Sequence, residues 1–144
     1  MEERKHRELA GEIAQEGIVL LENQGILPLS RGERIALYGR AVRHTIKGGT
    51  GSGDVNCRET VSLEQGMRES GANLEETGWL DVYDRVITRA RDSWRREIER
   101  KEAEGKVFID AYFETPYPNP EENLIEEWQM AKAETVLYAL GRIS

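Results

Sequence analysis

Residues 34–56, RIALYGRAVRHTIKGGTGSGDVN, decide the fold class of this chain. The run Arg34–Gly39 is a short apolar stretch that ends at a glycine, which predicts a buried strand of a parallel sheet. A long, polar, glycine-rich segment follows it. In an open α/β fold the chain leaves such a strand at the carboxyl edge of the sheet, where ligands bind. The stretch therefore predicts an α/β fold with a candidate binding loop after its first strand.

Helices and strands alternate along the rest of the chain. Apolar residues at steps of three and four predict helices, which we place at residues 3–22, 61–70 and 79–104, and another that begins at Asn119 or Pro120. A second strong strand is predicted at 135–141 and a weak one at 73–76, whereas 106–112 alternates only weakly. This order indicates right-handed βαβ units. Because few strands are visible, the expected fold is α/β, a partial three-layer α/β/α sandwich with a mostly parallel sheet.

The segment KGGTGSGDVN at residues 47–56 holds four glycines within six residues. Because ordering glycine costs conformational entropy, this density suggests positive φ angles or close approach to a ligand. Asp54 stands where the Walker pattern needs lysine and where the dinucleotide pattern needs its third glycine, so neither phosphate loop fits. The polar groups suit a neutral polyol instead, and they belong to Thr50, Ser52, Asp54 and Asn56. A solvated turn is the alternative, and both interpretations stay open.

Composition narrows the class of protein. The chain has 144 residues, with 27 acidic against 20 basic side chains and a net charge of −7, which fits one compact domain. No apolar run approaches the roughly 20 residues of a membrane span, and no signal sequence opens the chain. Without a dense basic stripe, nucleic acid is not an expected partner. The single cysteine, Cys57, suits a reducing compartment, so we expect a cytoplasmic protein.

The remaining histidine, cysteine and aromatic side chains lack the partner residues that a metal or catalytic site needs. His6 and His44 are too few for a metal centre, and Cys57 has no paired histidine, so neither metal nor cofactor is expected. Tyr117, among prolines, rims a substrate entrance or belongs to an ordinary surface loop. The three tryptophans fall on apolar faces of the expected helices and are expected in the core, at positions Trp79, Trp94 and Trp128.

Several stretches together resemble one known family. Residues 6–23, HRELAGEIAQEGIVLLEN, followed by GILPL and RIALYG, are similar to the opening of the C-terminal sandwich domain of glycoside hydrolase family 3. Residues 47–56 resemble the glycine-rich loop of its β-glucosidase branch, and residues 62–67, SLEQGM, resemble its next helix. Residues 133–144 resemble a later strand and the start of a Ser-Gly-Glu motif, whereas residues 79–120 match only in layout.

The resemblance implies an active site shared between two domains. A barrel domain would hold the nucleophilic aspartate, and the sandwich domain would supply the general acid/base glutamate, as retaining hydrolysis requires two carboxyl groups. The chain ends at Ser144, where the motif would continue to glutamate, so no catalytic residue is expected within it. Ser52 is expected to line the sugar subsite, with Thr50, Gly51 and Asp54 as further candidates. Arg142, at a strand end, either positions the missing acid or lies on the surface.

The resulting prediction is a fragment of a β-glucosidase-like retaining glycoside hydrolase acting on terminal β-linked sugars. Residues 1–144 would form one truncated sandwich domain, with residues 1–30 as a lead-in helix and connector. Its expected partners are the carbohydrate substrate of the parent enzyme and the missing barrel domain. Because the sheet is incomplete, its edge beside Val136, Leu137 and Leu140 is expected to make the fragment a homo-oligomer. The alternative is a free-standing, non-catalytic α/β binding or assembly module.

Overall fold

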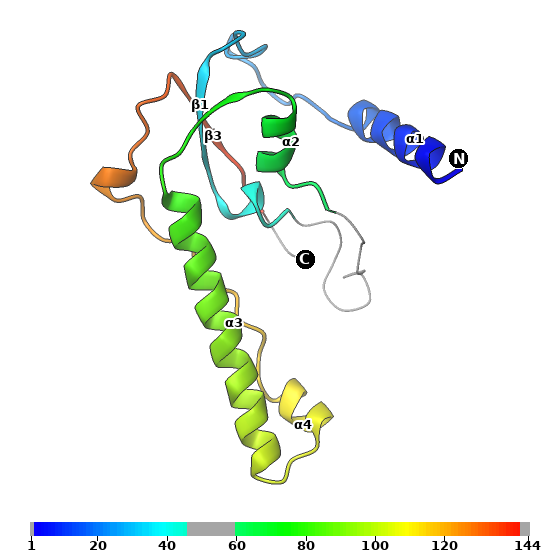
Figure 1. Cartoon of the computed structure of the whole chain (residues 1–144), viewed down its shortest axis with the longest axis vertical. Helices are drawn as coiled ribbons and strands as arrows, with labels where there is room; N and C mark the ends of the chain where they lie inside the picture. The colour runs from blue at the N-terminus through cyan, green and yellow to red at the C-terminus, as the bar shows by residue number, and fades with distance from the viewer. Residues whose placement is uncertain (1, 46–59, 142–144) are drawn as a thin grey trace. The chain divides into compact units, whose positions relative to one another are not determined.

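The computed structural model describes residues 2–45 and 60–141, drawn in colour in Figure 1. Two compact units make up the chain, Met1–Arg31 and Gly32–Ser144. The first contains the helix α1 (Glu2–Glu16). The second contains the elements β1 (Arg34–Tyr38), η1 (Arg40–Val42), α2 (Leu63–Glu69), β2 (Asn73–Glu75), α3 (Trp79–Ala103), α4 (Phe108–Phe113), η3 (Glu127–Gln129) and β3 (Thr135–Tyr138). No helix among the described residues is long and apolar enough to cross a membrane.

The first unit has a shorter helix than the sequence predicts. Instead of continuing to residue 22, α1 ends at Glu16, so the last part of that prediction is wrong. Gly17 closes the helix with a 2.9 Å hydrogen bond from its N–H to the carbonyl of Ile13. Glycine disfavours a helix interior, and the β-branched Ile18 and Val19 follow it, so local preference stops the helix there. Residues 18–21, which fall within the predicted helix, are exposed.

The second unit is built on a parallel sheet with the strand order β2-β1-β3. Ile35 of β1 pairs with Leu74 of β2 and with Thr135 of β3. The central strand is covered on both faces, since Ile35 to Tyr38 are each at most 4% exposed. A short apolar run is typical of such a strand. The predicted α/β fold and its parallel sheet are therefore confirmed.

The long helix α3 runs away from the sheet and does not cross back over it (Figure 1). Only its first turns bury side chains against the sheet, at Trp79, Leu80 and Tyr83. Farther out, Trp94 donates a 2.9 Å hydrogen bond to the carbonyl of Thr115 on the returning chain. We call residues 79–123 the helical arm.

The stretch 106–112, whose weak alternation allowed a strand as one interpretation, lies mostly in helix α4 (Phe108–Phe113) of the arm. Far from the sheet it has no strand to pair with, so a helix satisfies its backbone groups internally. The Thr115 hydroxyl adds a 2.8 Å hydrogen bond to the carbonyl of Ala111.

The prediction of a helix that begins at residue 119 or 120 is wrong, since only the short η3 forms in this part of the chain. Side chains of the core bind its backbone instead. Trp79 Nε1 donates to the Asn123 carbonyl at 3.1 Å, and the Tyr38 hydroxyl donates to the Gln129 carbonyl at 2.5 Å. These carbonyls have partners without a helix, which removes one reason to form it.

The three tryptophans divide among three environments. Trp79 is fully buried and stacks on Tyr83 with ring centroids 5.4 Å apart, as predicted for the core. Trp94 is half-buried and packs edge-on against Tyr117, which lies 56% exposed in the arm. Trp128 is 62% exposed, so its predicted core position is wrong, because the helix that was to bury it does not form.

Candidate functional site

The carboxyl edge of the sheet is the candidate site, because the chain passes from β1 to the glycine-rich segment there. Gly39 ends β1 with a φ of 94°, and a side chain on it would overlap the carbonyl oxygen of Ala139 beyond β3. Only glycine fits this close approach. From Gly39 the chain passes through η1 to Thr45, after which residues 46–59 lie outside the described residues.

The predicted sugar-binding residues Thr50, Gly51, Ser52 and Asp54 all lie outside the described residues. The same holds for Cys57 and Arg142. Their roles stay predictions. What the structure does define is the framework on either side of the segment, up to Thr45 and again from Thr60.

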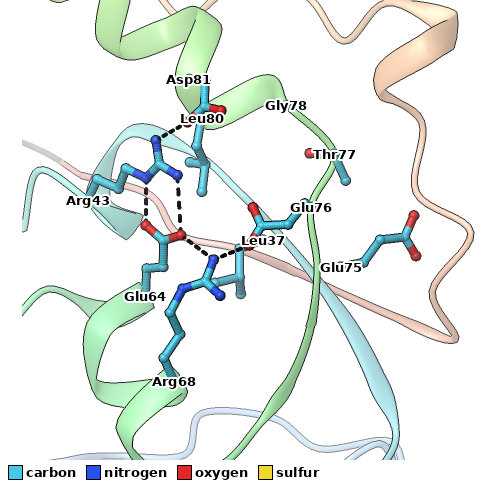
Figure 2. A pocket seen from close by; sticks show the side chains of 10 residues that line it. All are labelled: Leu37, Arg43, Glu64, Arg68, Glu75, Glu76, Thr77, Gly78, Leu80 and Asp81. Carbon is cyan, nitrogen blue, oxygen red and sulfur yellow. Dashed lines mark hydrogen bonds and ion pairs between the residues drawn. The ribbon is translucent and has the colours of Figure 1, made fainter.

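Charged side chains gather beside this edge in a network that we call the Arg43 cluster. Figure 2 shows the Arg43 guanidinium between the carboxylates of Glu64 on α2 and Asp81 on α3. Arg43 Nε and Nη2 bind the two Glu64 oxygens at 2.5 and 3.2 Å. Arg43 Nη1 binds Asp81 at 2.6 Å and Asp84 at 2.8 Å. Arg68 extends the network from Glu64, at 2.8 Å, to Glu76.

The ion pairs hold both members of the Arg43–Glu64 pair in their charged forms. Hydrogen bonding to Glu64 is the main reason that the pKa of Arg43 rises above its ordinary value. The same bond lowers the pKa of Glu64 from its ordinary 4.5, against a smaller opposing effect of burial. The side chains of Arg43 and Glu64 are only 22% and 12% exposed, so solvent screens this pair less than a surface pair.

The Arg43 cluster is a structural network and not a ligand pocket. The hollow that it lines beside Leu37 and Leu80 has a volume of about 10 Å³, room for no more than one water molecule. Within residues 2–45 and 60–141, no three His, Cys, Asp or Glu side chains gather to hold a metal ion. His44, which was considered as a ligand, instead pairs with Asp84 at 2.7 Å and lies against the edge of Tyr83.

A second polar group, the Glu122 cluster, ties the ends of β1 and β3 to the returning chain of the arm. The Glu122 carboxylate accepts a 2.9 Å hydrogen bond from the Arg40 backbone N–H and another from the Tyr138 hydroxyl. Arg40 Nη1 donates to Asn119 Oδ1 at 2.8 Å. The pKa of Tyr138 rises to about 12, mainly because its neutral hydroxyl donates a hydrogen bond to the Glu122 carboxylate.

Sequence analysis missed both clusters. Arg40 and Glu122 are 82 positions apart, and Arg43 and Glu64 are 21 apart. No periodic pattern links residues at such separations. One local signal existed for Glu64, since Ser62 caps α2 by accepting a hydrogen bond from the Gln65 N–H, which places the glutamate in the first turn.

Together, the parallel sheet and the glycine-rich connection at its carboxyl edge define an α/β domain of the sandwich type. The model of the glycosyl hydrolase family 3 C-terminal domain matches residues 18–143. The chain therefore belongs to that family, and the resemblance noted in its sequence is confirmed.

Relatives with established names support the assignment. The chain is 32% identical over 141 residues to β-glucosidase A of Butyrivibrio fibrisolvens, covering 97% of this chain but 15% of that protein. It is 40% identical over 73 residues to a β-glucosidase of Ruminococcus albus, covering 50% of this chain and 8% of the relative. The chain thus spans about a sixth or less of the length of these relatives.

Solved structures agree with the fold. The structure of β-glucosidase 3B from Thermotoga neapolitana in complex with glucose matches with a TM-score of 0.71 and 33% identity. A second structure of that enzyme, in complex with glycerol, matches with a TM-score of 0.70 and 34% identity. Each match covers 98% of this chain and 18% of the solved chain. Similarity therefore extends over nearly all of these 144 residues.

Proposed function

We propose that this chain is part of a retaining β-glucosidase that acts on terminal β-linked sugars. The observation that supports this most directly is the similarity, over 98% of the chain, to a β-glucosidase solved in complex with glucose. The curated relatives carry the same name. In this proposal a barrel domain of the longer protein supplies the nucleophilic aspartate, and a glutamate outside these 144 residues serves as general acid/base. Retaining hydrolysis needs the two carboxyl groups about 5 Å apart.

The glycine-rich segment is proposed to bind the sugar. Ser52 would donate to or accept from a sugar hydroxyl, with Thr50, Gly51 and Asp54 beside it. Two observations support this role. The described chain leads toward the segment from the carboxyl end of β1, through η1 to Thr45, and parallel α/β sheets bind ligands at that edge. The sequence of the segment offers polar groups with no cluster of cations. The Arg43 guanidinium already pairs with three carboxylates, so its donors are taken and do not compete for the sugar.

Replacing Ser52 in the longer enzyme tests the sugar-binding role. Ser52→Ala is expected to lower kcat/KM for an aryl β-glucoside. The expected loss of transition-state stabilisation is about 1 to 2 kcal/mol, the order of one lost hydrogen bond. The matched control is Ser93→Ala, which removes an exposed hydroxyl from α3 in the arm. Unchanged kinetics for Ser52→Ala would return the segment to a structural role.

The 144-residue polypeptide alone is expected not to hydrolyse an aryl β-glucoside above background, because neither proposed catalytic carboxylate lies within it. The measurement is product release by the purified chain, with a heat-unfolded sample as control. Turnover that follows the folded protein would contradict the proposed division of the site between domains.

A further inference from the structure

Trp128 presents an aromatic ring to solvent that the structure holds in one place. Its side chain is 62% exposed, yet the ring packs directly on the backbone of Gly78, where a Cβ would lie 2.8 Å from the ring atom Cζ3. Only glycine leaves room for an indole so close to the chain, and Gly78 also has a φ of 76°. The exposed part of the ring therefore faces away from a rigid backbone support.

The polar edge of the indole is fixed as well. Trp128 Nε1 donates a 2.6 Å hydrogen bond to Glu126 Oε2. Glu126 is itself held at the start of η3, because its backbone N–H donates to Gln129 Oε1 at 3.0 Å and Gln129 is fully buried. A ring that is already ordered loses little conformational freedom when a ligand covers it, which favours binding.

We call Gly78, Glu126 and Trp128 the Trp128 platform. Gly78 follows β2 and caps the start of α3, so the ring lies near the carboxyl end of a parallel strand. Open α/β sheets bind their ligands at that end. All three residues lie in the described part of the chain, so the platform is a site separate from residues 46–59.

The chemistry of the platform suits a neutral sugar ring. The face of an indole is electron-rich, so it attracts the C–H groups on one side of a pyranose. Carboxylates accept hydrogen bonds from hydroxyl groups, and Glu126 and Glu127 are both exposed. Residues 121–127 include four glutamates and no basic residue, so a uronate or a phosphate would be repelled. A cation is attracted to an indole face too, but membership of a glycosyl hydrolase family favours the sugar.

We propose that the Trp128 platform is a noncatalytic binding site for a neutral pyranose. The C–H face of the sugar stacks on the exposed side of Trp128, and its hydroxyls donate to Glu126 and Glu127. The proposal uses the family membership of the chain but neither the proposed hydrolysis nor Ser52. Its failure and the failure of the proposed function are therefore distinguishable.

Saturation-transfer NMR of the 144-residue chain with methyl β-D-glucoside tests the platform without turnover. The expected Kd is on the order of millimolar, because one stacked ring and a few hydrogen bonds leave little free energy after the cost of association. Transfer is expected to be stronger to the protons on one face of the pyranose than to those on the other, as stacking requires. Absence of transfer, or equal transfer to both faces, would overturn the proposal.

Replacing the tryptophan locates the site. Trp128→Ala is expected to reduce the transfer at least about fivefold, because it removes the stacking surface. Trp94→Phe is the matched control, since it changes a half-buried tryptophan of the arm and should leave the transfer unchanged. Undiminished transfer to a folded Trp128→Ala chain would mean that the sugar binds elsewhere, and would overturn the proposal.

Replacing the glycine tests the support beneath the ring. Gly78→Ala adds a Cβ that pushes the indole out of place, and it is expected to weaken binding about fivefold. Gly71→Ala is the control for backbone strain, because Gly71 has a φ of 82° but open space around it. Full binding by a folded Gly78→Ala chain would overturn the fixed platform, and if this variant does not fold, the comparison with Trp128→Ala decides.

Two further probes test the class of ligand. Methyl β-D-glucuronide keeps the ring but adds a carboxylate, and it is expected to bind at least about threefold more weakly beside the glutamates. Equal binding would overturn the role of the carboxylates. N-acetyl-arginine amide tests for a cation site, and tighter binding of this probe than of the glucoside would assign the platform to a basic protein surface and overturn the sugar site.

Discussion

At Gly39 the chain just after β1 closely approaches the backbone of Ala139, just after β3. Gly39→Ala is expected to destabilise the chain by about 3 kcal/mol or more, because it adds a backbone overlap with Ala139 to the strain of a positive φ. Gly105→Ala separates the two effects, since Gly105 has a φ of 96° but open space around it, and about 1 kcal/mol is expected there. Urea denaturation measures both. Equal losses of stability in the two variants would show that a small backbone shift relieves the overlap with Ala139.

Glu64 gives the chain a defined pH dependence. Its pKa is lower in the folded than in the unfolded state, so its stabilisation is complete above its ordinary pKa of 4.5 and is lost as the pH falls through the folded value. Glu64→Gln is therefore expected to cost about 2 kcal/mol at pH 7 and progressively less toward pH 3.

Denaturant unfolding at a series of pH values measures this difference. The control is Glu97→Gln, whose side chain is 41% exposed, pairs with Arg100 on the arm and is expected to matter much less. A cost for Glu64→Gln that stays constant from pH 7 to pH 3 would mean that its ion pair contributes nothing through the charge.

At the scale of elements, the outer part of the helical arm depends on its own small aromatic group. Trp94 packs edge-on against Tyr112 and Tyr117 and binds the Thr115 carbonyl. Trp94→Ala is expected to speed hydrogen exchange in residues 107–117 while leaving β1 and β3 protected, because local units unfold separately when few contacts join them. Arg91→Ala, at an exposed position of the same helix, serves as the control. Loss of protection in β1 as well would mean that arm and sheet unfold together.

At the scale of the whole molecule, the exposed edge of the sheet predicts self-association. Among the residues that the structure describes, β3 pairs with β1 on one side only, and its side chains Val136 and Tyr138 are about half exposed. Unpaired backbone groups beside apolar side chains are a template for another chain, so we expect a two-fold dimer that completes the sheet. Light scattering over a dilution series measures it.

A charge on the edge strand should oppose this association. Val136→Lys is expected to shift the equilibrium toward monomer, since lysines on edge strands block such pairing. Arg95→Lys, an exposed change on α3, should leave the equilibrium as it is. A wild-type chain that is monomeric at every concentration would show that this edge does not pair with a second copy.

The sequence by itself determined the central features of the fold. The apolar run 34–39 predicted β1, and the spacing of apolar residues predicted α2, α3 and the strands β2 and β3. Such patterns are visible because an element buried on one or both faces carries apolar residues at the positions that face the core. The order of the stretches that resemble glycoside hydrolase family 3 identified the family, which the match over residues 18–143 confirms.

Only the tertiary structure decided which partners the remaining backbone carbonyls and charged side chains find. The expected helix near residue 120 does not form, and two carbonyls of that stretch accept hydrogen bonds from Trp79 and Tyr38 of the core instead. The partners of Arg43 and Glu122 come from distant parts of the chain, and nothing in local spacing encodes such pairs. Propensity and periodicity act over a few residues, whereas these hydrogen bonds and ion pairs exist only once the chain has folded around its sheet.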